Sequence, residues 1–160
     1  MKPEIRPATR EDVGIILGFI RDLADYEKEP DAVVASEADI EDRLFDPQTT
    51  TEAVICLSAG KPAGFAAYFL SFSTWLGRDG LFLEDLYVSP EYRGQGFGKV
   101  LLKHLANIAV KRNCGRFEWN VLDWNEPAIK FYESKGANVM RDWDVVQLNQ
   151  KGIENYLKSI

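Results

Sequence analysis

Apolar residues recur at helical spacing near the start of the chain and give way to strand-like runs further on. Residues 10–25 carry apolar side chains three and four positions apart, which predicts an amphipathic helix after a short opening strand. Thr9 and Asp12 have the spacing of a helix cap at its start. Residues 36–39 repeat this pattern and predict a second, shorter helix, which ends at residues 46–47, Asp-Pro.

From residue 51 the pattern becomes that of a sheet. Residues 53–57 and 64–72 are apolar runs joined by a turn sequence at 59–62, which indicates two paired strands. A second turn at 77–80 leads into residues 81–88. Because this run is almost wholly apolar, it is expected to be a central strand covered on both faces.

In the rest of the chain, strands and helices alternate. A glycine-rich loop at residues 93–98 precedes an amphipathic helix, and residues 116–122 have the composition of a strand. Asn125 is a good cap for a following helix. Residues 139–148 are expected to form a final strand, with a short tail helix from about Gly152. Strands followed by this alternation predict an α/β fold with a mixed sheet and helices on both faces.

Composition and charge narrow the class of protein. The 160 residues, of which 46% are hydrophobic, are expected to form one domain, 1–160, with a substantial core. The net charge of −6 argues against nucleic acid as the main partner. Two cysteines are too few for a disulfide framework, which favours a reducing compartment. With neither a signal peptide nor a run of ~20 apolar residues, we expect no membrane association and a cytoplasmic protein.

Residues 93–99, Arg-Gly-Gln-Gly-Phe-Gly-Lys, lie between a buried strand and a helix. Glycines let successive backbone N–H groups turn toward one anion, and the helix N-terminus adds partial positive charge. This pattern predicts a phosphate or pyrophosphate site, and an ordinary glycine-rich turn is the alternative. The loop has neither the Gly-Lys-Ser/Thr ending of a Walker loop nor the spacing of the dinucleotide fingerprint.

Two adjacent acids, Glu84 and Asp85, interrupt the apolar run of residues 81–88. In a regular strand they would point to opposite faces. Acids in such a run are costly unless they are paired or functional, which makes them candidates for catalysis. The alternative is a bulge near the end of the strand that places both in solvent.

Other candidate residues are ambiguous on spacing alone. Tyr132 shares a helix face with Ala128 and Ile129, which favours a core aromatic. His104 is the only histidine and lies on the polar face of its helix, so we expect no multi-histidine metal site. We therefore expect no metal in the site.

These pieces, in this order, resemble the GNAT superfamily of acetyl-CoA-dependent N-acetyltransferases. The loop matches that family's R/Q-x-x-G-x-G/A signature with Arg93, Gly96 and Gly98, and Asn125 and Tyr132 fall where its later helix carries Asn and Tyr. The resemblance implies a mixed, mostly antiparallel central sheet with helices on both faces. A narrower similarity, to the spermidine/spermine and thialysine acetyltransferases, rests on residues 23–27, 75–77, 83–88, 92–94, 124–127 and 131–132.

The resemblance implies a site for acetyl-CoA as co-substrate. The backbone groups that would hold the acetyl and pantetheine arm are those of Leu86, Tyr87 and Val88. The pyrophosphate would be held by Arg93, Gly94, Gln95, Gly96, Phe97, Gly98 and Lys99. The far side of the arm would contact Asn125, Glu126, Pro127 and Ala128.

It also implies roles in the chemistry. Tyr132 would be the general acid that protonates the departing thiolate, and Glu84 the general base, acting through water. The amine pocket would be lined by Tyr26, Glu27 and Glu84. Asp142 would hold a distal cation. Arg141 beside it departs from the acidic polyamine pattern and favours a short diamine or a lysine-like amino acid.

The leading hypothesis is an N-acetyltransferase for a small cationic amine, which attacks acetyl-CoA directly in a ternary complex. An enzyme that acetylates a protein lysine or N-terminus is one alternative. A non-catalytic acyl-CoA sensor is another, although a sensor needs neither Glu84 nor Tyr132. The resemblance further implies a homodimer that pairs through C-terminal strands, for which Trp143, Val145, Val146 and Leu148 supply apolar surface.

Overall fold

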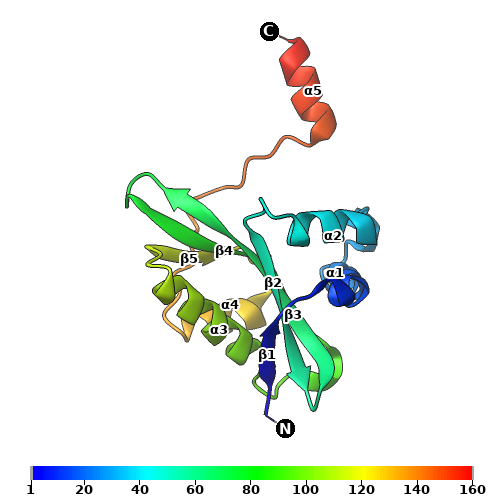
Figure 1. Ribbon diagram of the computed structural model, residues 1–160. Coiled ribbons are helices and arrows are strands. Elements are labelled where there is room, and N and C mark those ends of the chain that lie inside the picture. Colours follow the sequence, from blue (N-terminus) through cyan, green and yellow to red (C-terminus); the bar gives the residue numbers. More distant parts are fainter. Residues whose placement is uncertain (1, 160) are drawn as a thin grey trace. The chain divides into compact units, whose positions relative to one another are not determined.

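The computed structural model describes residues 2–159, and the chain divides into two compact units after Asn120. In the first unit, five strands form one sheet in the order β1-β2-β3-β4-β5 (Figure 1). Neighbouring strands run antiparallel except β4 and β5, which are parallel, so the sheet is mixed as predicted. The strands are β1 (Glu4–Pro7), β2 (Thr51–Ser58), β3 (Lys61–Ser73), β4 (Arg78–Val88) and β5 (Arg116–Trp119).

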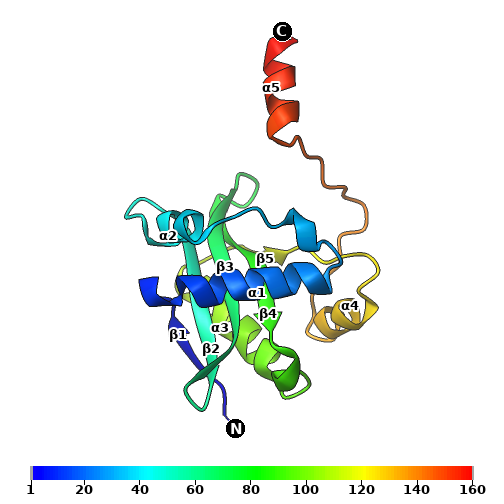
Figure 2. The same ribbon diagram turned by 90° about the vertical axis from the view of Figure 1, so that its right-hand side faces the viewer.

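Helices cover both faces of this sheet, as predicted. Figures 1 and 2 show α1 and α3 on opposite sides of it, with α2 on the side of α1. Short 3-10 helices η1, η2 and η3 lie in the connections. No helix among residues 2–159 is long and apolar enough to cross a bilayer. The helices of the first unit are η1 (Arg10–Asp12), α1 (Val13–Tyr26), η2 (Pro30–Ala32), α2 (Glu37–Phe45), η3 (Pro90–Tyr92) and α3 (Phe97–Lys111).

Each face of the sheet has its own hydrophobic core. On the α3 side, the buried side chains include Leu81 and Leu83 of β4 together with Leu101 of α3. On the α1 side, Phe19 stacks on Phe65 with ring centroids 5.7 Å apart, in a cluster that also contains Tyr87. Strand β4 therefore contributes to both cores, which explains its almost wholly apolar sequence.

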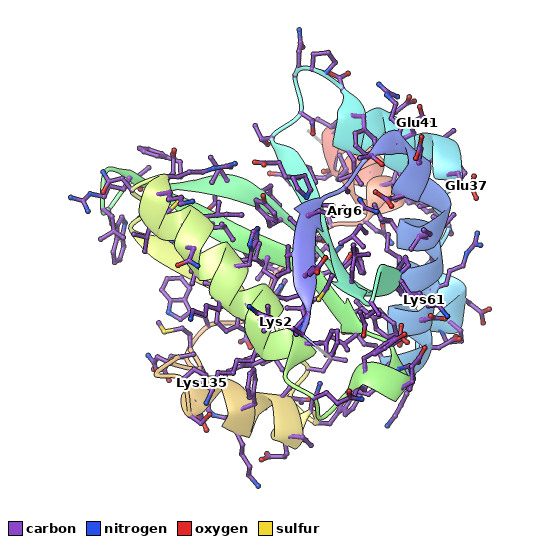
Figure 3. All side chains as sticks on the ribbon, turned by 60° about the horizontal axis from the view of Figure 1, so that its bottom comes forward. Lys2, Arg6, Glu37, Glu41, Lys61 and Lys135 are labelled. Carbon is purple, nitrogen blue, oxygen red and sulfur yellow. The ribbon has the colours of Figure 1, made fainter. Side chains whose placement is uncertain are left out.

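A partly buried ion pair fixes the start of α1. Asp12 is only 3% exposed, and the guanidinium of Arg6 donates to both its carboxylate oxygens at 2.6 and 2.7 Å. The backbone N–H of Thr9 donates to the same carboxylate at 2.7 Å. Hydrogen bonding to Arg6 lowers the pKa of Asp12 to about 2. The pair joins β1, where Figure 3 labels Arg6, to the first turn of the helical segment.

We expect Asp12→Ala to lower the free energy of unfolding by about 2 kcal/mol at neutral pH, measured by urea titration. A carboxylate with a depressed native pKa stabilises the fold above its ordinary value of 3.8, and this contribution is lost as pH falls toward 2. The variant therefore loses less stability on acidification than the wild type. Asp39→Ala, which removes an exposed capping carboxylate of α2, is the control and costs less. Equal losses in the two variants would contradict this role of Asp12.

The second unit contains α4 (Glu126–Glu133) and α5 (Gln150–Lys158). Asn125 caps α4, because its Oδ1 accepts the N–H of Ala128 at 3.4 Å. Gly136, with a φ of 88°, lies just past its end. The predicted cap, helix and tail helix are all confirmed.

The final strand predicted over residues 139–148 is wrong, because the structure has no strand there. Val145 and Val146 in this segment are 80% and 94% exposed. The segment has the apolar composition of a strand, but a strand forms only where a neighbouring edge supplies its hydrogen bonds. The structure shows no such pairing for these residues. Strand β5 likewise ends at Trp119 rather than at residue 122.

Candidate active site

The two acids of β4 lie at an irregularity in the sheet. Ala67 pairs with Asp85 and Tyr68 with Leu83, so Glu84 has no partner on β3. This is a β-bulge, which interrupts the alternation of side chains along a strand. The bulge given as the alternative is therefore confirmed, and the prediction of opposite faces is wrong, since both acids line one cavity. Glu84 is exposed there and Asp85 is partly buried.

This cavity has a volume of about 400 Å³ and lies between the end of α1, η2 and the bulge of β4. Its size is in the usual range of small-molecule sites. Glu27 and Glu84, both predicted for an amine pocket, line it together. The lining consists of apolar Ile20, Leu23, Ala24, Ala32 and Val33 and of four acids, Glu27, Glu29, Glu84 and Asp85.

The turn that ends α1 brings two of these acids to the cavity. Lys28 adopts a left-handed conformation with a φ of 66°. Its N–H donates to the carbonyl of Asp25 at 3.1 Å, and the N–H of Glu29 donates to that of Ala24 at 2.9 Å. This pair of bonds forms a Schellman motif, which usually has glycine at the left-handed position. Glu27 and Glu29 therefore flank a sharp reversal of the chain.

Burial and neighbouring charge raise the pKa values of the carboxyl groups in the cavity. Burial, with smaller contributions from the charges of Glu84 and Glu27, raises the pKa of Asp85 from its ordinary value of 3.8 to about 6. Burial also raises the pKa of Glu27. A cation in the cavity would relieve this repulsion and favour the ionised carboxylates. The electrostatics thus suit a cationic ligand.

An open edge of β4 begins at the bulge. The parallel pairing with β5 runs from Gly80 to Leu83, whose partner is Trp119, and ends there. Beyond Leu83, the edge of β4 that faces away from β3 has no strand partner in the described sheet. An extended ligand can form strand-like hydrogen bonds with such an edge.

Only two of the three predicted backbone positions face this edge. The N–H of Ser89 donates to the carbonyl of Ala63 in β3, which shows that the backbone of Ser89 faces β3. Because hydrogen-bonding directions alternate along a strand, Tyr87 turns its N–H and C=O toward β3. Those of Leu86 and Val88 therefore point to the open edge.

The glycine-rich loop leads from this edge into α3. Gly94 and Gly96 have φ angles of 71° and 88°, the left-handed region that favours glycine. Gly96 is the N-cap, so the first N–H groups of α3 have no intrahelical acceptor. The side chain of Phe97 is buried in the core and leaves only its backbone available. The loop and the helix N-terminus together suit an anion such as pyrophosphate.

Arg93 connects the loop, the open edge and α1. Its Nε donates to the carbonyl of Val88 at 2.8 Å. Its guanidinium lies over the rings of Tyr26 and Tyr87, at 5.0 and 5.3 Å from their centroids. The side chains of Arg93 and Tyr26, predicted to bind cofactor and amine, therefore contact each other.

The second unit carries the remaining predicted residues, which are Asn125, Glu126, Pro127, Ala128, Tyr132 and Asp142. Tyr132 is partly buried in the last turn of α4, with its ring centroid 5.6 Å from that of Phe131. Asp142 is exposed in the segment that follows the helix. The structure brings candidate residues together within each unit, so they form two groups.

Sequence reasoning did not assign Asp85 and Glu29 to the cavity. Asp85 is recognisable in the sequence as a second acid within an apolar run. The direction of its side chain, however, depends on the bulge. Glu29 carries no local signal, since the turn after α1 relies on a left-handed lysine. Among residues 2–159, no three His, Cys, Asp or Glu side chains are grouped so as to hold a metal ion.

Residues 17–137 match the family profile described as the acetyltransferase (GNAT) family. Thialysine N-epsilon-acetyltransferase of Sus scrofa is 40% identical over 141 residues, which cover 83% of this chain and 82% of that protein. L-ornithine N5-acetyltransferase of Arabidopsis thaliana is 41% identical over 92 residues, 58% of this chain and 40% of that protein.

Solved structures share the fold over nearly the whole chain. An integron cassette protein from the mobile metagenome of V. cholerae has a TM-score of 0.81 and 30% identity, with 99% of both chains covered. Ribosomal-protein-alanine N-acetyltransferase of Brucella melitensis has a TM-score of 0.74 at 22% identity, covering 92% of this chain and 100% of that one. At 22% identity, the similarity to the Brucella melitensis protein shows a shared fold only.

Proposed function

Because this chain belongs to the GNAT acetyltransferase family and is an N-acetyltransferase, we propose that it transfers the acetyl group of acetyl-CoA to a primary amine of a small cationic acceptor. The transfer occurs by direct attack in a ternary complex. The observation that carries the proposal is the acidic cavity at the bulge of β4, where the open edge of the same strand begins. A cavity suited to a cation therefore lies next to a strand edge that can bind the extended arm of an acyl carrier.

The residues present fit acetyl-CoA, the co-substrate of GNAT acetyltransferases, which supplies the acetyl thioester. Leu86 and Val88 would bind amide groups of the pantetheine arm with the backbone groups that face the open edge. The first N–H groups of α3 would bind the pyrophosphate. We propose that Asn125 and its neighbours on α4 contact the far side of the same arm, and that residues 1–160 form one acetyltransferase domain.

Proton transfer is assigned to two side chains. An alkyl ammonium has a pKa near ~10.4, so well under ~1% of it is nucleophilic at neutral pH. Glu84, exposed at the bulge, accepts a proton from the ammonium through water, and the neutral nitrogen forms its bond to the acetyl carbon. The carbon–sulfur bond breaks, and Tyr132 gives a proton to the thiolate. The nitrogen releases its second proton to solvent, and proton exchange with solvent returns Glu84 to its carboxylate and Tyr132 to its phenol.

We also propose a cytoplasmic homodimer. The chain has two cysteines, too few for a disulfide framework, which supports a reducing compartment. Trp143, Val145 and Val146 are 70–94% exposed and offer apolar surface to a second copy of the chain. Light scattering at micromolar concentration tests the assembly, and a monomer mass would contradict it.

The function is tested by measuring free thiol released from acetyl-CoA with a panel of amines. We expect a diamine to exceed a monoamine of equal length by about tenfold in kcat/KM, because the second cation meets the acidic cavity. Added salt reduces that margin. Release only with peptides would indicate a protein acceptor. Tight cofactor binding without amine-dependent release would indicate a sensor.

We expect Gly96→Val to weaken acetyl-CoA binding at least about tenfold in calorimetry, because its side chain would project where the pyrophosphate approaches the loop. Gly60→Val is the matched control. Gly60 has a similar φ of 78° in the β2–β3 turn, and both glycines have open space around them. Both variants carry the strain of a left-handed valine, about 1–2 kcal/mol. Unchanged affinity in folded Gly96→Val would remove the loop from the site.

A further inference from the structure

The acidic cavity is lined by four carboxylates and by no basic side chain. The carboxylates come from two walls: Glu27 and Glu29 from the turn after α1, and Glu84 and Asp85 from the bulge of β4. A second ammonium on the acceptor would be attracted to this charge. An α-carboxylate on the acceptor would meet like charges within the same space of about 400 Å³.

We propose that this cavity selects diamines over α-amino acids of the same chain length, and that Glu29 is the residue that determines this specificity. The inference rests on the proposed function and names its acceptor class. The reacting amine lies at the β4 wall, beside Glu84 and the open edge. Glu29 then binds the distal ammonium from the wall formed by the turn after α1.

The backbone of Glu29 is held from both sides. Its N–H donates to the carbonyl of Ala24 at 2.9 Å, and its own carbonyl accepts the N–H of Ala32 at 3.0 Å. Pro30 follows at the start of η2 and restricts the chain there. The carboxylate is thus presented from a fixed backbone, which reduces the entropy lost when a cation binds.

The names of two relatives suggest an amino-acid acceptor, whereas the negative charge of the cavity favours an acceptor without a carboxylate. Thialysine and ornithine, for which two relatives are named, are α-amino acids with a carboxylate. Two pairs of compounds isolate this group: 1,5-diaminopentane with lysine, and 1,4-diaminobutane with ornithine. Within each pair the carbon chain between the two amines is the same, and only the carboxylate differs.

The test is kcat/KM for these four compounds and for pentylamine, in the wild type, Glu29→Gln and Asp31→Asn. We expect each diamine to exceed its amino acid by about tenfold or more in the wild type. Glu29→Gln lowers this ratio about fivefold or more, through a higher KM for the diamine, and lowers kcat/KM for 1,5-diaminopentane more than kcat/KM for pentylamine. Asp31 is exposed two residues away and does not line the cavity, so Asp31→Asn leaves the ratio unchanged.

Each outcome decides a separate point. Faster acetylation of lysine or ornithine than of the matching diamine overturns the inference while the proposed function stands. Equal ratios in Glu29→Gln and Asp31→Asn remove Glu29 as the determinant. Failure to acetylate any amine, with acetyl-CoA bound, overturns the proposed function itself. Glu29 is exposed, so the variant is expected to fold, and its melting temperature verifies this.

Discussion

Tyr132→Phe will lower turnover by at least about tenfold, and by up to ~10⁴-fold if protonation of the thiolate limits the rate. The substitution removes one hydroxyl from a partly buried ring in the last turn of α4 and keeps the ring itself. We therefore expect the free energy of unfolding and the affinity for acetyl-CoA to change little. Steady-state kcat with a saturating diamine is the measurement.

Tyr156→Phe is the matched control, because it removes a hydroxyl from an exposed tyrosine of α5. Its turnover is expected to equal that of the wild type. If Tyr132→Phe also retains full turnover, Tyr132 is a core aromatic, as its helical spacing alone indicates, and has no role in proton transfer.

Asp85→Asn will stabilise the protein at pH 7 and weaken its activity. Because the pKa of Asp85 is raised from 3.8 to about 6, the folded state loses stability as pH rises through this interval. Above pH 6 the ionised carboxyl carries the whole penalty, at most about 3 kcal/mol. Removing the charge recovers about 1–3 kcal/mol in urea unfolding at pH 7, and little near pH 4.

The same substitution removes a negative charge that the proposed cation meets. We expect kcat/KM for a diamine to fall about tenfold, so that stability and activity change in opposite directions. Asp79→Asn, at an exposed position of the same strand, is the control and is expected to change neither. Destabilisation by Asp85→Asn at pH 7 would contradict the origin assigned to its raised pKa.

The helices were predictable because their signals are local. The side chain of Ser36 accepts the N–H of Asp39, whose carboxylate accepts the N–H of Ser36, as the spacing of these residues indicates. Arg10 further binds Glu41 of α2, which Figure 3 labels, and joins the two helical segments. The two residues of this contact are 31 positions apart in the chain, so the local sequence pattern does not indicate it.

The features that the sequence left open, or that were predicted wrongly, depend on distant partners. A bulge at Glu84 and Asp85 was one of two alternatives, and the register between β3 and β4, which a strand's own composition does not reveal, decides between them. Residues 139–148 have apolar composition, but the structure pairs them with no edge. Gly80 was expected in a turn, yet it pairs with Ser71 inside the sheet, and the hairpin turn lies earlier, at residues 74–77.

The most direct test of the account is to identify the product by mass spectrometry after the protein, acetyl-CoA and 1,5-diaminopentane react. We predict monoacetylated diamine in equal amount to the free thiol, and its near-complete loss in Glu84→Gln. Thiol released without acetylated diamine, or acetylated diamine formed as fast by Glu84→Gln as by the wild type, would contradict amine acetylation at the bulge of β4.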